Sequence, residues 1–220
     1  MSTRPPTASQ VRRREPRSEG GKAFLTALGL LAVMWVVQAV NANLGEVLDQ
    51  DYGILPRTAH GLIGIAAAPW LHASWQHIEG NSLPFLVLAT LAAWRGLGRF
   101  ALASLIIIVV AGLGTWLISP VGVVTIGASG WILGLFTYTI ARGFFQHRLA
   151  DVITALIAGA VYWGIIFDVL PQGGGISWQD HLSGAIGGLI AASVLCRRRA
   201  AASPVKPPRP RGPAGGSGGL

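Results

Sequence analysis

Six long apolar segments, separated by short polar stretches, limit what this chain can fold into. Charged residues make up 12% of the 220 residues, about half the share that is usual in a soluble domain. They gather at the two ends of the chain and at narrow points between the apolar segments. A helix needs about 20 apolar residues to cross a bilayer. The sequence therefore predicts an all-α, polytopic integral membrane protein with six transmembrane helices, near residues 23–40, 77–94, 100–118, 128–141, 152–170 and 181–196.

The composition also argues against several other classes of protein. The formal net charge is +8, but the basic residues do not alternate with aromatic residues, so we expect no nucleic-acid partner. The single cysteine, Cys196, rules out a disulfide framework or a cysteine-rich metal site, and no metal or other cofactor is predicted. We interpret residues 23–198 as one membrane domain. A disordered basic tail, 1–22, precedes it and a disordered Pro/Gly-rich tail, 199–220, follows it.

The lysines and arginines predict the orientation of the chain, because cytoplasmic loops carry an excess of them. With six crossings and both termini in the cytoplasm, only Arg57 of the 17 basic residues lies outside. The prediction is a multi-pass protein of a prokaryotic plasma membrane. One alternative concerns the first apolar segment, since residues 40–42, Val-Asn-Ala, imitate a signal-peptide cleavage site. The segment is long for a signal peptide.

Polar residues within or beside apolar segments are candidates for function, because a membrane makes them costly. Four such residues are His77, Asn81, Ser129 and His181. Taken singly, each has a structural explanation, such as helix packing or a position at the interface. Counted from the first arginine on the cytoplasmic side, however, Ser129, Asn81 and His181 lie at depths of roughly 20 to 24 Å at 1.5 Å per residue. Because these three residues lie at a similar depth on three different helices, we predict that they form one site.

The fourth apolar segment is short, which gives a second argument for a site. If its helix begins near Ser129, residues 120–128 enter the membrane without being helical, and Pro120 and Gly122 favour such a break. Non-helical backbone is tolerated at that depth only inside the protein or along a water-filled cavity. A cavity that ends at a serine on a helix N-terminus suits a membrane hydrolase, because water enters and main-chain amides stabilise an oxyanion.

Glycines near the serine and the second histidine favour close packing of two helices. Small residues on one helical face let helix backbones approach each other in a membrane. We therefore expect the fourth and sixth segments to bring Ser129 within hydrogen-bond reach of His181. The glycines are Gly127, Gly130 and Gly134 around the serine, and Gly184 and Gly188 after the histidine.

Three motifs resemble those of the rhomboid family of intramembrane proteases. Residues 127–130, Gly-Ala-Ser-Gly, resemble its G-x-S-G motif, and residues 77–81, His-Ile-Glu-Gly-Asn, resemble its H-x-x-x-N motif. His181 with Gly184 and Gly188 resembles the H-x-x-G-x-x-x-G motif of the sixth span. The motifs follow the order of the family within residues 23–197, and His72 is similar to a histidine found in many members.

The resemblance implies an intramembrane serine endopeptidase that cleaves single-pass transmembrane substrates near the outer membrane face. By this resemblance Ser129 is the nucleophile and His181 the general base, a dyad without a third carboxylate. His77 and Asn81 help to form the oxyanion hole together with the amide of Ser129. Asp180 is rejected as a third member, because its side chain points about 100° away from that of His181 on a helix. The partners implied are these substrates and the lipid bilayer.

The resemblance departs from the family in one position and leaves two other functions open. Some members have a tyrosine that packs on the catalytic histidine, where this chain has Leu133. Trp131 and Trp178 are the candidates to support the ring in its place. A catalytically inactive rhomboid-like binding protein is one alternative, although such relatives typically lack the serine or the histidine. A small transporter is the other, although the repeats typical of transporters are not visible.

Overall fold

The computed structural model describes residues 17–171 and 177–201. Within these ranges the protein is helical and forms no β-strand, and one isolated bridge pairs Ile54 with Thr125. Three 3-10 segments, η2 (His60–Leu62), η3 (Ala68–Trp70) and η4 (Trp163–Val169), accompany the α-helices. The helices are α1 (Arg17–Asn43), α2 (Val47–Tyr52), α3 (Gly64–Ala67), α4 (Trp75–Ala93), α5 (Leu97–Ile118), α6 (Ser129–Gln146), α7 (Leu149–Tyr162) and α8 (Trp178–Ala201).

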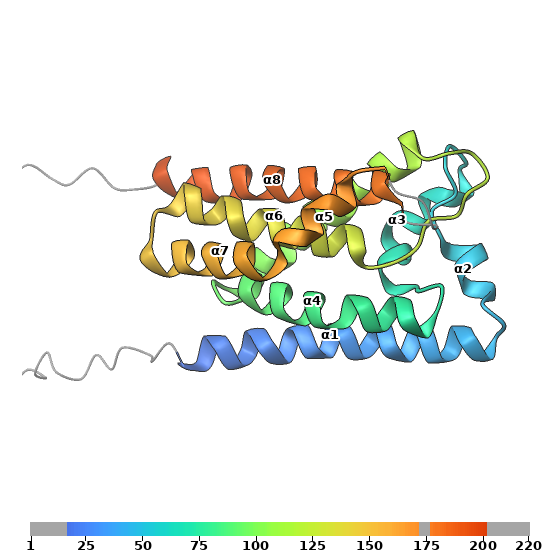
Figure 1. The fold of residues 1–220 in the computed structure, drawn as a ribbon, viewed down its shortest axis with the longest axis horizontal. Coiled ribbons are helices and arrows are strands. Elements are labelled where there is room, and N and C mark those ends of the chain that lie inside the picture. The colour runs from blue at the N-terminus through green and yellow to red at the C-terminus, as the bar shows by residue number, and fades with distance from the viewer. Residues whose placement is uncertain (1–16, 172–176, 202–220) are drawn as a thin grey trace, which may run out of the picture.

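The long helices α1, α4, α5, α6, α7 and α8 run along the long axis of the molecule (Figure 1). α1 begins and α8 ends at one end of this bundle, whereas α2 and α3 lie at the opposite end. Among the described residues, three segments are long and apolar enough to cross a membrane, namely Gly20–Asn43, Leu97–Ile118 and Leu149–Val169. The prediction of an all-helical chain is confirmed, and these three segments are capable of crossing a membrane, whereas the count of six crossings stays a prediction. α4, α6 and α8 are long enough but fall short in hydropathy, because they contain polar residues.

The helices agree with the predicted apolar segments but differ from them at their ends. α1 begins at Arg17, so residues 17–22 of the predicted tail are helical, and α8 continues to Ala201. Residues 1–16 and 202–220 of the predicted tails lie outside the described residues. The fifth segment changes to a 3-10 helix after Tyr162. A helix can continue beyond an apolar segment, because each N–H bonds to the carbonyl four residues earlier and every residue except proline has that N–H.

α6 lies at the centre of the bundle and contacts α4, α5, α7 and α8. Most of its side chains are buried, including Trp131, Leu135 and Tyr138. A helix that is buried all round has neighbours on every face. α1 lies at the edge of the bundle and packs on α4, where the indole of Trp35 donates a hydrogen bond to the hydroxyl of Ser82 (3.0 Å).

An ion-pair cluster joins α4, α6 and α7 at the end of the bundle where α1 begins. The carboxylate of Asp151 lies 3.1 Å from Arg95 Nη2 and 3.2 Å from Arg142 Nε. Arg142 also donates to the carbonyls of Leu91 and Ala92 (3.1 and 3.2 Å). Arg142 and Asp151 are buried, and removing one partner of such a pair leaves a costly uncompensated charge. The cluster therefore holds three helices together, whereas the sequence indicated only that its arginines orient the chain.

The connection between α5 and α6 is not helical, as predicted for residues 120–128. Thr125 exchanges two main-chain hydrogen bonds with Ile54 (2.9 and 3.0 Å), and the Gly127 amide donates to the Ala68 carbonyl (2.9 Å). These bonds satisfy backbone groups that would otherwise be unpaired. Gly127 has a φ of +124°, a conformation that residues with a Cβ rarely adopt. The connection thus leads the chain directly to the start of α6.

Candidate active site

A cavity of about 850 Å³ brings the predicted site residues together. His77 and Asn81 of α4, Ser129 of α6 and His181 of α8 all line it. The connection 119–126 and residues 177–180 form other parts of its wall. Ser129, Asn81 and His181, which sequence spacing placed at one depth, thus share one cavity wall, and His77 joins them. The chemistry that they can perform depends on how each side chain is held.

Ser129 is the first residue of α6, and the preceding Ala128 provides no side-chain cap. The first amides of a helix have no partner within the helix and carry partial positive charge. The serine is partly exposed and lines the cavity. A hydroxyl in this position is accessible to a ligand, and nearby amides can stabilise negative charge that develops on that ligand.

The first turns of α4 direct His77 and Asn81 into the same cavity. Ser74 caps this helix, and its hydroxyl accepts a hydrogen bond from the His77 amide (3.1 Å). Such a cap defines where a helix begins. Residues four apart share one helical face, so both side chains line the cavity.

The contacts of His77 place its proton on the ring nitrogen that lies near the serine. The amide of Ala73 donates to His77 Nδ1 (3.4 Å), so a neutral ring carries its proton on Nε2. Between this nitrogen and the serine hydroxyl lies the position that a side chain at residue 127 would occupy, and residue 127 is a glycine. A Cβ at Gly127 would lie 2.9 Å from His77 Nε2 and 3.7 Å from Ser129 Oγ. The glycine therefore leaves room for an N–H donor beside the serine hydroxyl.

The contacts of His181 produce the opposite tautomer. Its Nδ1 lies 2.8 Å from the main-chain oxygen of Asp168. A carbonyl only accepts, so Nδ1 carries the proton and Nε2 keeps a free lone pair. A free lone pair on a fixed ring is what a general base requires. The two histidines thus offer complementary groups, a donor on His77 and an acceptor on His181.

The Asp168 carbonyl is the contact that supports the His181 ring, a question that the sequence left open. Of the two candidates from the sequence, Trp131 packs in the core against the rings of Trp70, Phe85 and Phe100. Trp178 lies in the cavity wall. A main-chain carbonyl has no sequence signature, because every residue carries one. This contact could be found only in the structure.

Asn81 presents an amide donor without a partner. Its Nδ2 is buried and makes no hydrogen bond to any part of the chain that the structure describes. Leaving a buried donor unsatisfied costs about 1–3 kcal/mol. Because Asn81 lines the cavity, a ligand oxygen that enters it can satisfy this donor.

Glycines bring the main chains of α6 and α8 into contact. A Cβ at Gly184 would overlap the carbonyl of Gly130, and a Cβ at Gly188 would overlap the carbonyl of Gly134. A Cβ at Gly134 would lie 2.8 Å from the Gly184 oxygen. The hydroxyl of Thr137 then donates to a main-chain carbonyl of α8 (2.7 Å). Larger residues at these positions would separate the helices that carry the serine and the histidine.

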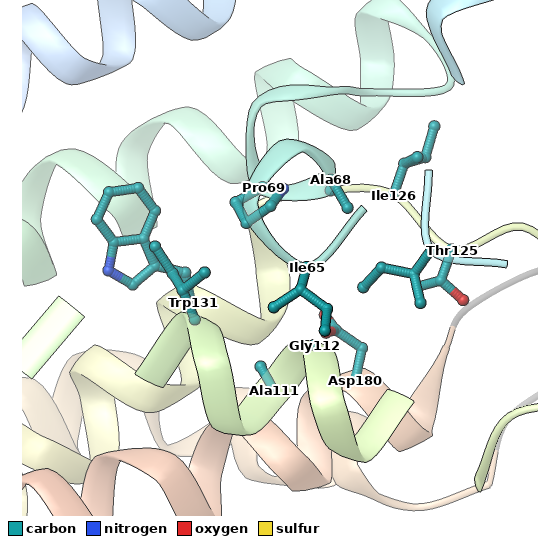
Figure 2. Close-up of a pocket in the computed structure, with 12 residues that line it drawn as sticks. Ile65, Ala68, Pro69, Ala111, Gly112, Thr125, Ile126, Trp131 and Asp180 are labelled. Carbon is teal, nitrogen blue, oxygen red and sulfur yellow. The ribbon is translucent and has the colours of Figure 1, made fainter. Parts of the chain in front are cut away.

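Asp180 is next to His181 in the sequence, but its carboxyl group is bound elsewhere. It accepts a hydrogen bond from the Thr115 hydroxyl of α5 (3.1 Å). Figure 2 shows Asp180 extending from α8 toward the turn of α5 that contains Gly112, in a small cavity of about 10 Å³. The described contact of His181 Nδ1 is the Asp168 main chain. Asp180 therefore does not occupy the place of a triad acid on this ring.

Asp49 of α2 adds an ionisable group to the cavity wall. Asn41 Nδ2 donates to its carboxylate (2.8 Å), and Asn41 Oδ1 accepts from the Leu48 amide (3.0 Å). Burial raises the pKa of Asp49 to about 6, although the Asn41 bond lowers it in part. The charge of this wall therefore changes near that pH. Asn41, which was part of the alternative cleavage site, is buried within α1.

A comparison with protein families decides where this chain belongs. The Rhomboid domain matches residues 59–198, a region that contains all four cavity residues described above. The chain belongs to the rhomboid family.

Relatives of this rhomboid occur in several bacteria. Uncharacterized protein Rv1337 of Mycobacterium tuberculosis and Uncharacterized protein Mb1372 of Mycobacterium bovis are each 40% identical to it over 201 residues. Each match covers 87% of this chain and 82% of the relative. The Bacillus subtilis protein named "Putative rhomboid protease YdcA" is 30% identical over 184 residues, which cover 77% of this chain and 85% of that protein. The rhomboid is thus an integral membrane protein with bacterial relatives.

Proposed function

We propose that this rhomboid is an intramembrane serine endopeptidase that cleaves single-pass transmembrane proteins near the outer membrane face. Rhomboid proteins are generally intramembrane serine proteases. The observation that carries the proposal is the complementary hydrogen bonding of two histidines that share one cavity with Ser129. His181 offers a lone pair at Nε2 and His77 offers an N–H at Nε2. One is suited to remove the serine proton and the other to stabilise the resulting oxyanion.

The proposed reaction follows from these groups. Ser129 Oγ attacks the carbonyl carbon of the scissile peptide bond while His181 Nε2 takes the hydroxyl proton. The amide of Ser129, His77 Nε2 and Asn81 Nδ2 stabilise the tetrahedral oxyanion. The imidazolium then protonates the leaving amine, and the C–N bond breaks to leave an acyl-enzyme. Water enters through the cavity and attacks the acyl carbon while His181 takes its proton. The bond between that carbon and Ser129 Oγ then breaks, the carboxyl product leaves, and His181 returns the proton to the serine oxygen.

We also propose that α1, α4, α5, α6, α7 with η4, and α8 make six crossings of a prokaryotic plasma membrane, with both termini in the cytoplasm. α1 begins and α8 ends at the same end of the bundle (Figure 1), as an even number of crossings requires. The distribution of lysines and arginines favours placing that end inside. The site then faces the outer side, where water is available.

Cysteine accessibility provides a test of this orientation. Glu46 and Arg148 are exposed and precede α2 and α7, respectively. In a variant in which Cys196 is replaced by serine, we expect Glu46→Cys to react with a membrane-impermeant maleimide in intact cells. Arg148→Cys is expected to react only after permeabilisation. Labelling of Arg148→Cys from the outside would contradict the proposed orientation and the six crossings.

Substitutions in α4 test the proposed oxyanion hole. Removing one oxyanion donor typically lowers the rate about 10²–10³-fold, so we expect Asn81→Ala and His77→Ala each to reduce turnover by that order. Neither is expected to match the loss of the nucleophile, because other donors remain. Ser82→Ala is a control on the same helix, since its hydroxyl bonds to Trp35 and the Ile78 carbonyl. Wild-type turnover in both variants would show that Asn81 and His77 are not oxyanion donors and only pack in the structure.

The alternative is an inactive rhomboid-like binding protein. The presence of Ser129 and His181 weighs against it, because inactive relatives typically lack one of them. The experiment that separates the two functions uses purified protein in liposomes with a single-pass transmembrane substrate. Cleavage by the wild type and not by Ser129→Ala supports the protease. A wild type that neither cleaves the substrate nor reacts with a fluorophosphonate probe supports the binding protein.

A further inference from the structure

One buried carboxyl group takes no part in the proposed reaction. Asp180 lies in the first turn of α8, is 7% exposed and precedes His181. The Thr115 hydroxyl of α5 donates to its Oδ1 (3.1 Å). Ionisable residues within membrane helices are expensive and are candidates for function by default. The surroundings of this carboxyl group therefore need a physical explanation.

The carboxyl group of Asp180 packs on the main chain of Gly130. A Cβ at Gly130 would overlap Asp180 Oδ2 and would lie 2.6 Å from both Cγ and Oδ1. The three atoms nearest to that Cβ position all belong to Asp180, so this carboxyl group is what requires a glycine here. The carboxyl group also interacts with the main-chain amide of Gly130.

This contact lies at the start of the helix that carries the serine. Ala128, the N-cap residue of α6, has no side chain that can bind the free amides of the first turn. A carboxyl group near such amides stabilises a helix N-terminus. Asp180 places one there from a different helix. The start of α6 therefore depends on α8 for a group that a local cap normally provides.

We propose that Asp180 is a positioning residue for the nucleophile, which holds the first turn of α6 where Ser129 faces His181. The inference rests on the proposed protease function. Residues 180 and 181 are adjacent in α8, and residues 129 and 130 are adjacent in α6. The contact between Asp180 and Gly130 therefore fixes how far α6 is shifted along its axis and rotated about it relative to α8, next to Ser129 and His181. Thr115 fixes the carboxyl group from α5, the third helix, which Figure 2 shows beside it.

The kinetic test compares substitutions of Asp180 and Thr115. A misplacement of about 1 Å can cost about 10²-fold in rate, so Asp180→Ala is expected to lower kcat by that order. We expect KM to stay within about threefold, because the interactions that bind the ground state remain. Asp180→Asn keeps the shape and an oxygen acceptor, and it is expected to recover most of the rate. Thr115→Val removes the hydrogen bond to the carboxyl group, and its kcat is expected to lie between those of Asp180→Ala and Asp180→Asn.

A second measurement does not depend on proteolysis. Gly130→Ala is expected to lower the melting temperature of the purified protein, because the new methyl group collides with the carboxyl group. In an Asp180→Ala background those carboxyl atoms are gone, so the same change is expected to cost much less. The four proteins form a double-mutant cycle. Additive shifts in melting temperature would show that the contact does not exist and would overturn the proposal.

The outcomes separate this inference from the proposed function. If the wild type is active and Asp180→Ala keeps its kcat, Asp180 does not position the nucleophile, even if the unfolding cycle is non-additive. If Asp180→Ala loses kcat, Asp180→Asn recovers it and the cycle is non-additive, the positioning role is supported. An inactive wild type whose Ser129 does not react with a fluorophosphonate would overturn the protease itself, and the positioning role with it.

Discussion

Ser129→Ala is expected to abolish cleavage of a transmembrane substrate while the protein remains folded and inserted. In the proposed reaction the serine oxygen forms the bond to the scissile carbonyl, so its removal leaves no nucleophile for that step. Loss of the nucleophile in a soluble serine protease costs about 10⁶-fold in kcat. Product formation by the variant is therefore expected to fall below detection. The measurement is the release of the substrate fragment from liposomes that contain purified protein.

Ser119→Ala is a matched control for the loss of the nucleophile. Ser119 is a second serine in the wall of the same cavity and, unlike Ser129, it is buried, so its substitution removes a hydroxyl group without removing the proposed nucleophile. We expect it to retain turnover and fluorophosphonate labelling, and Ser129→Ala to lose both. Proteolysis at the wild-type rate by Ser129→Ala would rule out this serine as the nucleophile.

His181→Ala is expected to be nearly as damaging as the loss of the serine. Without an acceptor at Nε2, no group removes the hydroxyl proton as the bond forms, and none returns a proton to the leaving amine. Nucleophile and base act as one unit, so the double variant with Ser129→Ala is expected to be scarcely worse than either single variant. The measurement is turnover for the two single variants and the double variant.

A structural role for His181 predicts a different result. A histidine that only packs at the membrane interface would give a mild loss, and that loss would add to the effect of Ser129→Ala. His60→Ala is the control for the substitution itself, because His60 is exposed in η2. If His181→Ala retained most of the wild-type rate, the dyad would be disproved, whatever family the chain belongs to.

The long helices could be predicted from the sequence for a physical reason. In a bilayer each backbone group must bond within the protein, so an apolar segment of sufficient length becomes a helix. The prediction held for the segments Gly20–Asn43, Leu97–Ile118 and Leu149–Val169. It missed α2, η2, α3 and η3, which lie between Val47 and Trp70. These short elements have no long apolar period. η2 and α3 pack on α5, and main-chain hydrogen bonds join Ile54 and Ala68 to the connection between α5 and α6.

The sequence also indicated which side chains to consider, because polar residues inside apolar segments are rare. Its motifs placed Ser129, His77 and Asn81 on named segments, and the break before Ser129 followed from Pro120 and Gly122. The sequence could not show which ring nitrogen of each histidine carries the proton. The protons of His77 and His181 are located by the amide of residue 73 and the carbonyl of residue 168.

The sequence by itself determined the helical class, the approximate helix positions and the residues from which a site can be built. These depend on side-chain polarity along one helix, which can be read without knowing its neighbours. Only the tertiary structure decided that Asp168 supports His181, that Asp180 packs on Gly130, and that Asp151 binds two arginines. Each of these contacts joins different helices, and two of the three involve main-chain atoms. Main-chain atoms are the same in every residue, so only the packing of the helices reveals which of them meet.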